Sequence, residues 1–265
     1  MRRVVLALGI VVVGAGAVAA HAGAHTVAHH RDALVPGAMN ARTFSDEGVE
    51  YRYQLFVPRD YDPSRRWPVI VALHGSREKG TDGVSQATVG LAPILLEQAS
   101  TFPAVVVFPQ VHPGEPVSRV VTVMQRLVDA ALRDVNADPH RIYLTGLSFG
   151  GVIAYDVLLS APGRFAAVVP VAAQPVVLSP NSTTRIAEPD ADAAVARALH
   201  DTPVWIFHGA QDSAIPVDRT RRLVSALRAA GVAVTYTEYA DGGHVVWDRA
   251  YRSPALWAWM FARHR

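Results

Sequence analysis

The amino-acid sequence predicts one α/β domain built on a mostly parallel, doubly wound sheet. Short apolar runs rich in valine recur along the chain, and stretches with helical periodicity lie between them. Such alternation favours an open sheet with helices on both faces, because neighbouring parallel strands are usually connected through a helix. The chain has 265 residues, of which 50% are hydrophobic and 18% are charged, so it can bury one large core.

The predicted strands begin at residue 51. The segment YRYQLFV, residues 51–57, alternates polar and apolar side chains, as a half-buried strand does. The next strands are continuous apolar runs, which are typical of central parallel strands covered on both faces. They occupy residues 68–74, 104–110, 141–146, 166–172 and 203–209, and VTYTEY at residues 234–239 is the last strand.

Helical periodicity predicts helices between these strands. The longest covers residues 118–135 and places its apolar side chains on one face. Others are expected at residues 149–160, 218–230 and 253–263. Residues 174–202 make a long connection, for which we expect a loop and then a short helix that form a wall or lid over a site.

The N-terminus has the layout of a secretory signal peptide. Arg2 and Arg3 precede an uncharged run over residues 4–20, and small residues then recur with the spacing of a cleavage site. We therefore expect residues 1–22 to be a signal peptide and the protein to be secreted or periplasmic. The alternative is an uncleaved membrane anchor, which the glycine and alanine in the second half of the run disfavour. No later segment is long and apolar enough for stable membrane insertion.

Two further parts follow the expected signal peptide. Residues 23–44 are interpreted as a flexible leader, and residues 45–265 as the folded domain. His25 and His29 belong to a group of histidines that could bind a metal weakly, but a solvated leader is the simpler interpretation. No metal site and no cofactor are predicted for the domain.

The composition argues against several classes of function. Cleavage of the signal would remove two of the 25 basic residues, which leaves 23 against 23 acidic residues. A formally neutral domain with a single lysine gives no reason to expect a nucleic-acid partner. The chain has no cysteine, which excludes disulfides, a cysteine nucleophile and thiolate metal sites.

The segment TGLSFGG, residues 145–151, carries the first candidate for chemistry. Ser148 lies between Gly146 and Gly150, after a predicted strand and before a predicted helix. In this context the Gly-x-Ser-x-Gly pattern is typical of a bend that exposes a serine nucleophile. The bend is tight, so the flanking residues must be small, and the helix N-terminus beneath the serine favours negative charge. The alternative is an ordinary turn that contains a serine.

A serine nucleophile needs a histidine base, and the base needs an acid that orients it. With this fold the acid follows the serine in the chain and the histidine comes last. The histidines after Ser148 are His200, His208, His244 and His264. We assign the base to His244, which lies in a glycine-rich loop after the last predicted strand. His208 ends a strand and is interpreted as a packed or loop-orienting residue.

The orienting acid is expected at the end of the strand before that loop. Asp212, in HGAQDSAIPV, lies there, at the edge where the sites of open α/β sheets gather. Asp241 is the alternative acid because it shares the loop of His244, but its Asp-Gly-Gly context is typical of a turn. Asp218 and Asp248 are interpreted as helix-starting or surface residues.

An oxyanion hole needs two backbone N–H groups. One is expected from Phe149, the residue after the candidate nucleophile. The loop LHGSREKGTDG follows an early central strand and suggests the N–H of Ser76 as the second donor. His74, at the start of that loop, is interpreted as a residue that shapes the loop rather than as a base.

These segments together resemble single-domain, secreted members of the α/β-hydrolase superfamily, often described as predicted peptidases or carboxylesterases. That group is related to the polyhydroxybutyrate-depolymerase/feruloyl-esterase and the phospholipase/carboxylesterase groups. The likeness runs through nearly the whole mature chain. It includes YRYQLFVPRDYDPSRRWPVIVALHG, FPAVVVFPQ, VNADPHRIYLTGLSFGG, PVWIFHGAQDSAIPV and TYTEYADGGHVVWDRAY.

The resemblance implies the α/β-hydrolase fold, with Ser148 as nucleophile, Asp212 as acid and His244 as base. It also implies the amides of Ser76 and Phe149 as the oxyanion hole. The chain departs from its relatives in two places. Arg77 stands where a small residue is common, and the segment VHPGEPVSR lacks a tryptophan that relatives often carry after FPQ. Both departures concern the substrate site, as does Trp247, which is expected either to line that site or to pack in the core.

The sequence therefore predicts a serine hydrolase that cleaves carboxylic esters, on a small molecule or linked to a polymer. No cofactor is expected to take part. A peptidase that acts on short peptides is the first alternative, because the same triad cleaves amides. A non-catalytic binding protein on the same fold is the second, since a fold alone does not determine function.

Overall fold

An eight-stranded sheet organises the molecule in the computed structural model, which describes residues 33–175 and 190–265. The strand order across the sheet is β1-β2-β4-β3-β5-β6-β7-β8. The strands are β1 Met39–Asp46, β2 Val49–Phe56, β3 Trp67–Leu73, β4 Val105–Pro109, β5 Ala137–Leu147, β6 Ala167–Val171, β7 Val204–Gly209 and β8 Val234–Tyr239. β2 pairs antiparallel with both β1 and β4, and every pairing from β4 to β8 is parallel.

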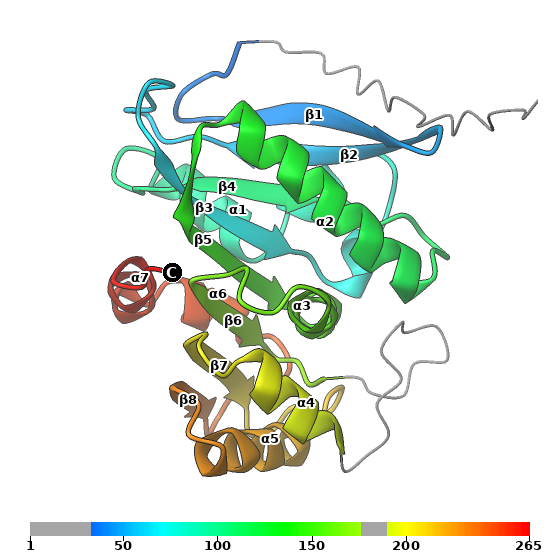
Figure 1. The fold of residues 1–265 in the computed structure, drawn as a ribbon, viewed down its shortest axis with the longest axis vertical. Coiled ribbons are helices and arrows are strands. Elements are labelled where there is room, and N and C mark those ends of the chain that lie inside the picture. The colour runs from blue at the N-terminus through cyan, green and yellow to red at the C-terminus, as the bar shows by residue number, and fades with distance from the viewer. Residues whose placement is uncertain (1–32, 176–189) are drawn as a thin grey trace, which may run out of the picture.

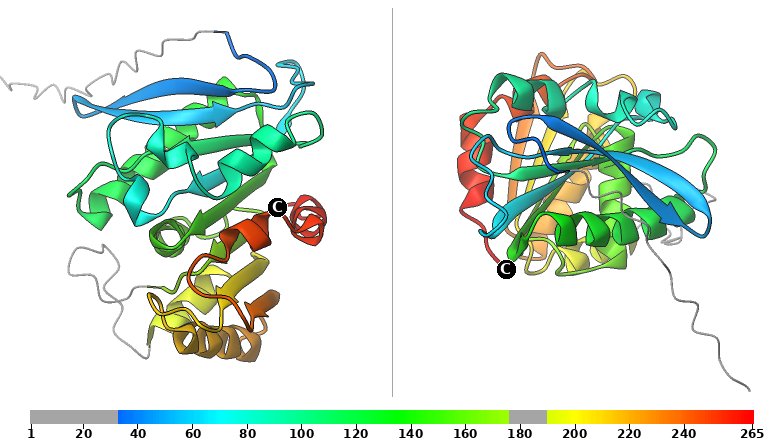
Figure 2. Two further views of the ribbon diagram at one scale, coloured as in Figure 1. Left: turned by 180° about the vertical axis from the view of Figure 1, so that it is seen from behind. Right: turned by 90° about the horizontal axis from the view of Figure 1, so that it is seen from above.

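Helices cover both faces of this sheet (Figures 1 and 2). One face packs against α2 Val117–Asp134, α3 Phe149–Ser160, α4 Asp190–Ala198 and α5 Val217–Ala229. The other packs against α1 Leu91–Glu97, α6 Trp247–Tyr251 and α7 Pro254–Phe261. Two short 3-10 helices, η1 Ser76–Glu78 and η2 Ser85–Ala87, lie in the loop after β3.

The central strands β3, β4 and β6 are apolar along their whole length because both of their faces are buried. Val69 and Val71 of β3 point into the core beneath α2 and α3, whereas Ile70 points into the core on the opposite face. Side chains alternate in direction along a strand, so a strand covered on both faces must be apolar at every position. The prediction of a doubly wound, mostly parallel sheet is confirmed, with β2 as its antiparallel exception.

The folded part begins earlier than the sequence predicts. The expected leader, residues 23–44, overlaps β1, which pairs with β2 along its full length. Asn40 anchors this strand, because its buried side chain bonds the backbone of Val35 and Leu55. The segment MNARTFSD has too few apolar residues for alternation to reveal it, and it is held as a strand by backbone pairing with β2.

Several predictions fall outside the described residues. They are the signal peptide at 1–22, the leader histidines, and residues 176–189 of the long connection expected to form a wall or lid. Within the described part of that connection, α4 supplies the short helix that was expected. Among the described residues, no helix combines the length and the apolar character that crossing a bilayer requires.

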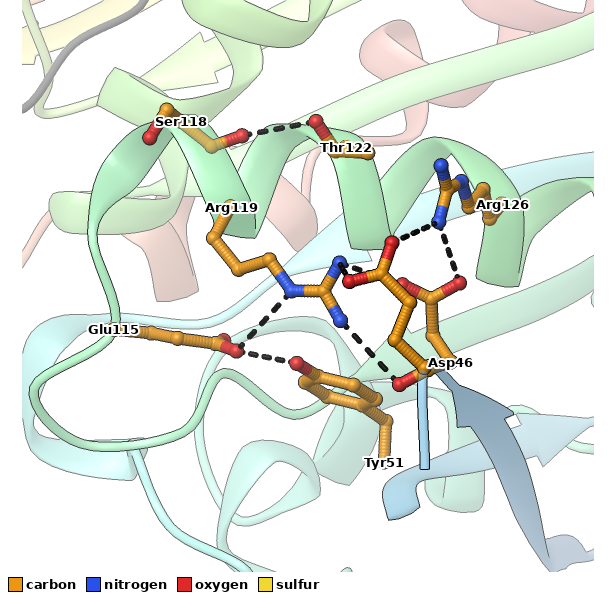
Figure 3. A network of polar contacts seen from close by, with 8 residues as sticks. Asp46, Tyr51, Glu115, Ser118, Arg119, Thr122 and Arg126 are labelled. Carbon is orange, nitrogen blue, oxygen red and sulfur yellow. Dashed lines mark hydrogen bonds and ion pairs between the residues drawn. The ribbon is translucent and has the colours of Figure 1, made fainter. Parts of the chain in front are cut away.

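A cluster of charges joins the β1–β2 hairpin to α2 (Figure 3). The carboxylate of Asp46 is almost fully buried and lies 2.8 Å from Arg119 Nη1 and 2.7 Å from Arg126 Nη1. Glu47 contacts the same two guanidinium groups from the exposed side. The hydroxyl of Tyr51 donates to Glu115, which also faces Arg119. β1 is an edge strand, and these contacts link its end to a helix.

Replacing Asp46 by alanine is expected to lower the free energy of unfolding by about 1–3 kcal/mol, the usual penalty when a partly buried polar group loses its hydrogen-bond partner. Urea denaturation measures the change. Glu50→Ala is the matched control on the same hairpin, because Glu50 pairs with Arg52 in an exposed position. That substitution should lower the free energy of unfolding by less than about 1 kcal/mol. Equal losses in the two variants would contradict the role given to the buried pair.

Candidate active site

Three polar side chains meet at the carboxyl edge of the parallel strands. Ser148 directly follows β5, Asp212 follows β7, and His244 follows β8. Parallel strands end at the same edge of a sheet, so loops from distant parts of the chain gather there. The order of the strands, β5-β6-β7-β8, places the three loops on one side of the molecule.

Ser148 occupies a strained bend between β5 and α3. Its backbone has φ 51° and ψ −120°, a conformation that few non-glycine residues adopt. A Cβ on Gly146 would lie 2.3 Å from the carbonyl oxygen of Gly150, and a Cβ on Gly150 would lie 2.3 Å from that of Leu73. Both positions therefore exclude any larger residue. The bend is held by a 2.9 Å hydrogen bond from the amide of Ser148 to the carbonyl of Val171 on β6.

His244 joins the other two side chains in one chain of hydrogen bonds. Its Nδ1 lies 2.7 Å from Oδ2 of Asp212, and its Nε2 lies 2.9 Å from Oγ of Ser148. A carboxylate only accepts hydrogen bonds, so Nδ1 carries the proton and donates it. Nε2 is then free to accept from the serine hydroxyl, which is the arrangement that makes an imidazole a base towards serine.

Asp212 is buried and well supplied with donors. Its Oδ1 accepts from the amides of Ala214 and Ile215, both at 2.8 Å, and its Oδ2 accepts from His244. Burial alone would raise the pKa of this carboxyl, but the hydrogen bonds from His244 and the two amides outweigh it and hold the pKa below its ordinary value. Asp212 is therefore an anion at neutral pH.

The alternative residues lie elsewhere. Asp241 is exposed and pairs with Arg249 at 2.8 Å. Asp218 pairs with Arg221 on α5. His200 is exposed and contacts Asp201. None of these side chains is bonded to Ser148 or His244.

His74 shapes the loop that carries the second expected oxyanion donor. Its Nε2 accepts from the amide of Val111 at 3.0 Å, so its Nδ1 carries the proton and donates to the carbonyl of Gly75 at 2.6 Å. In a trans peptide the C=O and the following N–H point in opposite directions. By holding the Gly75 carbonyl, His74 therefore also fixes the direction of the N–H of Ser76.

Phe149 is the first residue of α3, and the first N–H groups of a helix have no acceptor within the helix. Its ring lies under the ammonium group of Lys79, with Nζ 3.7 Å from the ring centroid. Partial burial lowers the pKa of Lys79. The ring thus contacts the loop after β3, while the amide lies next to Ser148 in the chain.

A cavity of about 570 Å³ opens above Ser148 and His244. Ser76, Arg77 and Trp247 line it, and the ring of Trp247 stands perpendicular to that of His244 at 5.6 Å between centroids. Sequence reasoning missed the other lining residues, chiefly Glu78, Val89, Leu147, Ile215 and Val245. Most of them are chain neighbours of the predicted residues, and that adjacency was the available signal.

Comparisons with known proteins identify the family of the chain. A family model for the dienelactone hydrolase family matches residues 100–253, more than half of the chain. The chain belongs to the dienelactone hydrolase family. It is an α/β-hydrolase, and membership supports hydrolase activity. Among curated proteins, none matches the chain significantly.

Solved structures of hydrolases share the fold. A thermostable esterase is 29% identical with a TM-score of 0.69, over 87% of this chain and 64% of that one. The chain thus covers less than two thirds of that esterase. The feruloyl esterase module of Clostridium thermocellum is 14% identical (TM-score 0.66; 84% of this chain, 88% of that one). An acylaminoacyl peptidase of Pyrococcus horikoshii is 16% identical (TM-score 0.63; 84% and 41%). At such identities the last two show the fold alone.

The buried His74 should make stability depend on pH. Burial lowers the pKa of His74 to about 4, against an ordinary value of 6.5. Between these values the unfolded chain binds a proton that the folded protein does not, so stability rises with pH across this window. The rise in the free energy of unfolding that is attributable to His74 is about 3 kcal/mol.

Unfolding free energies between pH 4 and pH 7 measure this contribution. In His74→Asn, whose amide can still donate to the Gly75 carbonyl, the rise should shrink by that amount. The exposed His200→Asn is the control and should keep the full rise. An unchanged pH dependence in His74→Asn would refute the assignment of a neutral, buried ring.

Proposed function

We propose that the protein hydrolyses carboxylic esters through Ser148, His244 and Asp212 and an acyl-enzyme intermediate. The observation that carries the proposal is the continuous chain of hydrogen bonds from Ser148 through His244 to a buried carboxylate, beneath an open cavity. Membership of a hydrolase family and the 29% identity to a thermostable esterase support the ester as substrate.

In the first half of the reaction His244 Nε2 takes the proton of the Ser148 hydroxyl as Oγ attacks the ester carbonyl carbon. The imidazolium that forms is stabilised by the anionic Asp212 across the 2.7 Å contact. The tetrahedral intermediate collapses, His244 returns the proton to the leaving alcohol oxygen, and the acyl group remains on Ser148. In the second half water attacks the acyl group with the same base, and the acid product leaves.

The oxyanion of each tetrahedral intermediate is assigned to the amides of Ser76 and Phe149. His74 orients the first through the Gly75 carbonyl, and the N-terminus of α3 presents the second. Fixed amides of this kind stabilise developing charge without reorganisation during the reaction. Each such donor is typically worth about 10²–10³ in kcat.

The cavity indicates where the two halves of the ester would lie. Val89, Leu147 and Ile215 form an apolar wall suited to a hydrocarbon group, and Trp247 adds a flat apolar surface beside His244. Arg77 is exposed at the mouth and can contact a polar or anionic part of the substrate. The open mouth is compatible with a small ester or with an ester linked to a polymer. The proposal that the protein lies outside the cytoplasm rests on the N-terminal run of residues 1–22 alone.

Replacing Ser148 by alanine should lower kcat for nitrophenyl ester hydrolysis by about 10⁴-fold or more, because no other group can form the acyl intermediate. Asp212→Asn should also lose several orders of magnitude, since the asparagine favours the wrong histidine tautomer. Asp241→Asn is the matched control, the same change at the alternative acid, and should retain activity.

A fluorophosphonate probe should label the unmodified protein and fail to label Ser148→Ala. Comparison with aminoacyl anilides separates an esterase from a peptidase: higher kcat/KM for the anilides would replace the proposed substrate class by a peptide. Folded protein that neither reacts with the probe nor turns over any ester or anilide would instead support a binding role.

A further inference from the structure

The buried histidine at the end of β7 has contacts that the proposed reaction does not use. His208 has no exposed surface, and it lies four residues before Asp212 in the chain. Its Nδ1 lies 2.9 Å from Oγ1 of Thr220 on α5. Its Nε2 lies 2.9 Å from the carbonyl oxygen of Ile215 and 3.2 Å from Oδ2 of Asp212.

These neighbours show that Nε2 of His208 carries a proton. A carbonyl oxygen only accepts, so Nε2 donates to Ile215, and Oδ2 of Asp212 lies 3.2 Å from the same nitrogen. Nδ1 contacts the hydroxyl of Thr220, which also lies 3.3 Å from the carbonyl oxygen of Ala173. Thr220 is itself buried, so these contacts hold the ring in one orientation.

The contact with Ile215 closes the turn that holds the acid. The amide of Ile215 donates to Oδ1 of Asp212, while the carbonyl of the same residue accepts from His208. Oδ2 of Asp212 lies between His208 Nε2 and His244 Nδ1. The carboxylate is therefore contacted on both oxygens, and its Oδ2 faces His208 as well as His244.

The other charges near His208 are already paired. Glu238 lies beside it in the β7–β8 register, and its carboxylate contacts Arg221 at 2.6 Å and Tyr236. The hydrogen bond with Arg221 lowers the pKa of Glu238 to about 2, so this group stays ionised and paired. Among the polar contacts of the ring, those with Thr220 on α5 and the carbonyl of Ile215 are neutral, and that with Asp212 is charged.

We propose that His208 is a positioning residue for the reaction. It fixes the Asp212 carboxylate at the distance and angle at which Asp212 holds His244 in the tautomer that accepts the serine proton. The inference rests on the proposed function. His208 does not line the cavity, so its effect reaches the substrate through Asp212 and His244, and through Ile215, which lines the cavity and whose carbonyl it holds.

His208→Met, which keeps much of the volume but has no donor, is the main test, with kcat counted per active site by fluorophosphonate titration. It should lower kcat about 10- to 100-fold, the range that outer partners of metal-site ligands show when removed. KM should change less than kcat, because His208 does not contact the substrate and reaches the cavity wall only through the Ile215 carbonyl. His208→Gln places an amide donor near the position of Nε2 and should recover part of the loss.

Matched controls separate positioning from loss of fold. His200→Met is the same change at an exposed histidine and should leave kcat unaltered. If His208→Met does not fold, Thr220→Val decides, because it removes the hydroxyl that contacts the ring and the carbonyl of Ala173. Thr122→Val, which removes a hydroxyl bonded to a carbonyl on the exposed face of α2, is its control. A drop in kcat for Thr220→Val, without one for Thr122→Val, supports the proposal.

Normal kcat per titrated site in His208→Met, or in Thr220→Val where the first does not fold, would overturn it. So would a loss in His208→Met that His208→Gln does not relieve at all. Failure of the proposed function would look different: Ser148→Ala would still turn over the ester, whatever the result at position 208.

Discussion

At the bend between β5 and α3, backbone atoms of three neighbouring strands approach one another more closely than any side chain would allow. Gly150 lies against the carbonyl of Leu73 on β3, and the amide of Ser148 bonds the carbonyl of Val171 on β6. The positive φ of Ser148 is strained, and the bend persists because β3, β6 and α3 all hold it. Everything proposed for the site depends on this bend, since it places the hydroxyl and the first amides of α3 at the same edge of the sheet.

The groups around the bend are kept in defined protonation states by their surroundings. Asp212 is buried, yet donors on both of its oxygens keep it an anion. His74 is buried with one nitrogen donating and the other accepting, and burial keeps it neutral. An anion that orients the base and a neutral ring that orients an amide are two separate tasks. Asp212 lies in the loop after β7 and His74 in the loop after β3, so each can be tested alone.

The sequence predicted the sheet, most of its strands and the position of Ser148, because continuous apolar runs and the glycine spacing each follow from a strict packing requirement. It did not predict β1, whose polar segment is held by backbone pairing and by Asp46, which bonds a helix more than 70 residues away in the chain. It placed His208 correctly as a packed or orienting residue but could not name its partners. Contacts such as that between His208 and Ile215 depend on how a loop turns, and no periodicity encodes them.

During turnover an acyl group should pass through Ser148, and rapid-quench mass spectrometry of the protein with a nitrophenyl ester tests this most directly. We expect a burst of nitrophenol that approaches one equivalent per chain when deacylation is slow, and a mass increase of one acyl group in the peptide that contains Ser148. The burst and the adduct should both vanish in Ser148→Ala. Steady turnover with no acylated peptide under conditions that trap such intermediates, or an adduct on a different residue, would contradict the account.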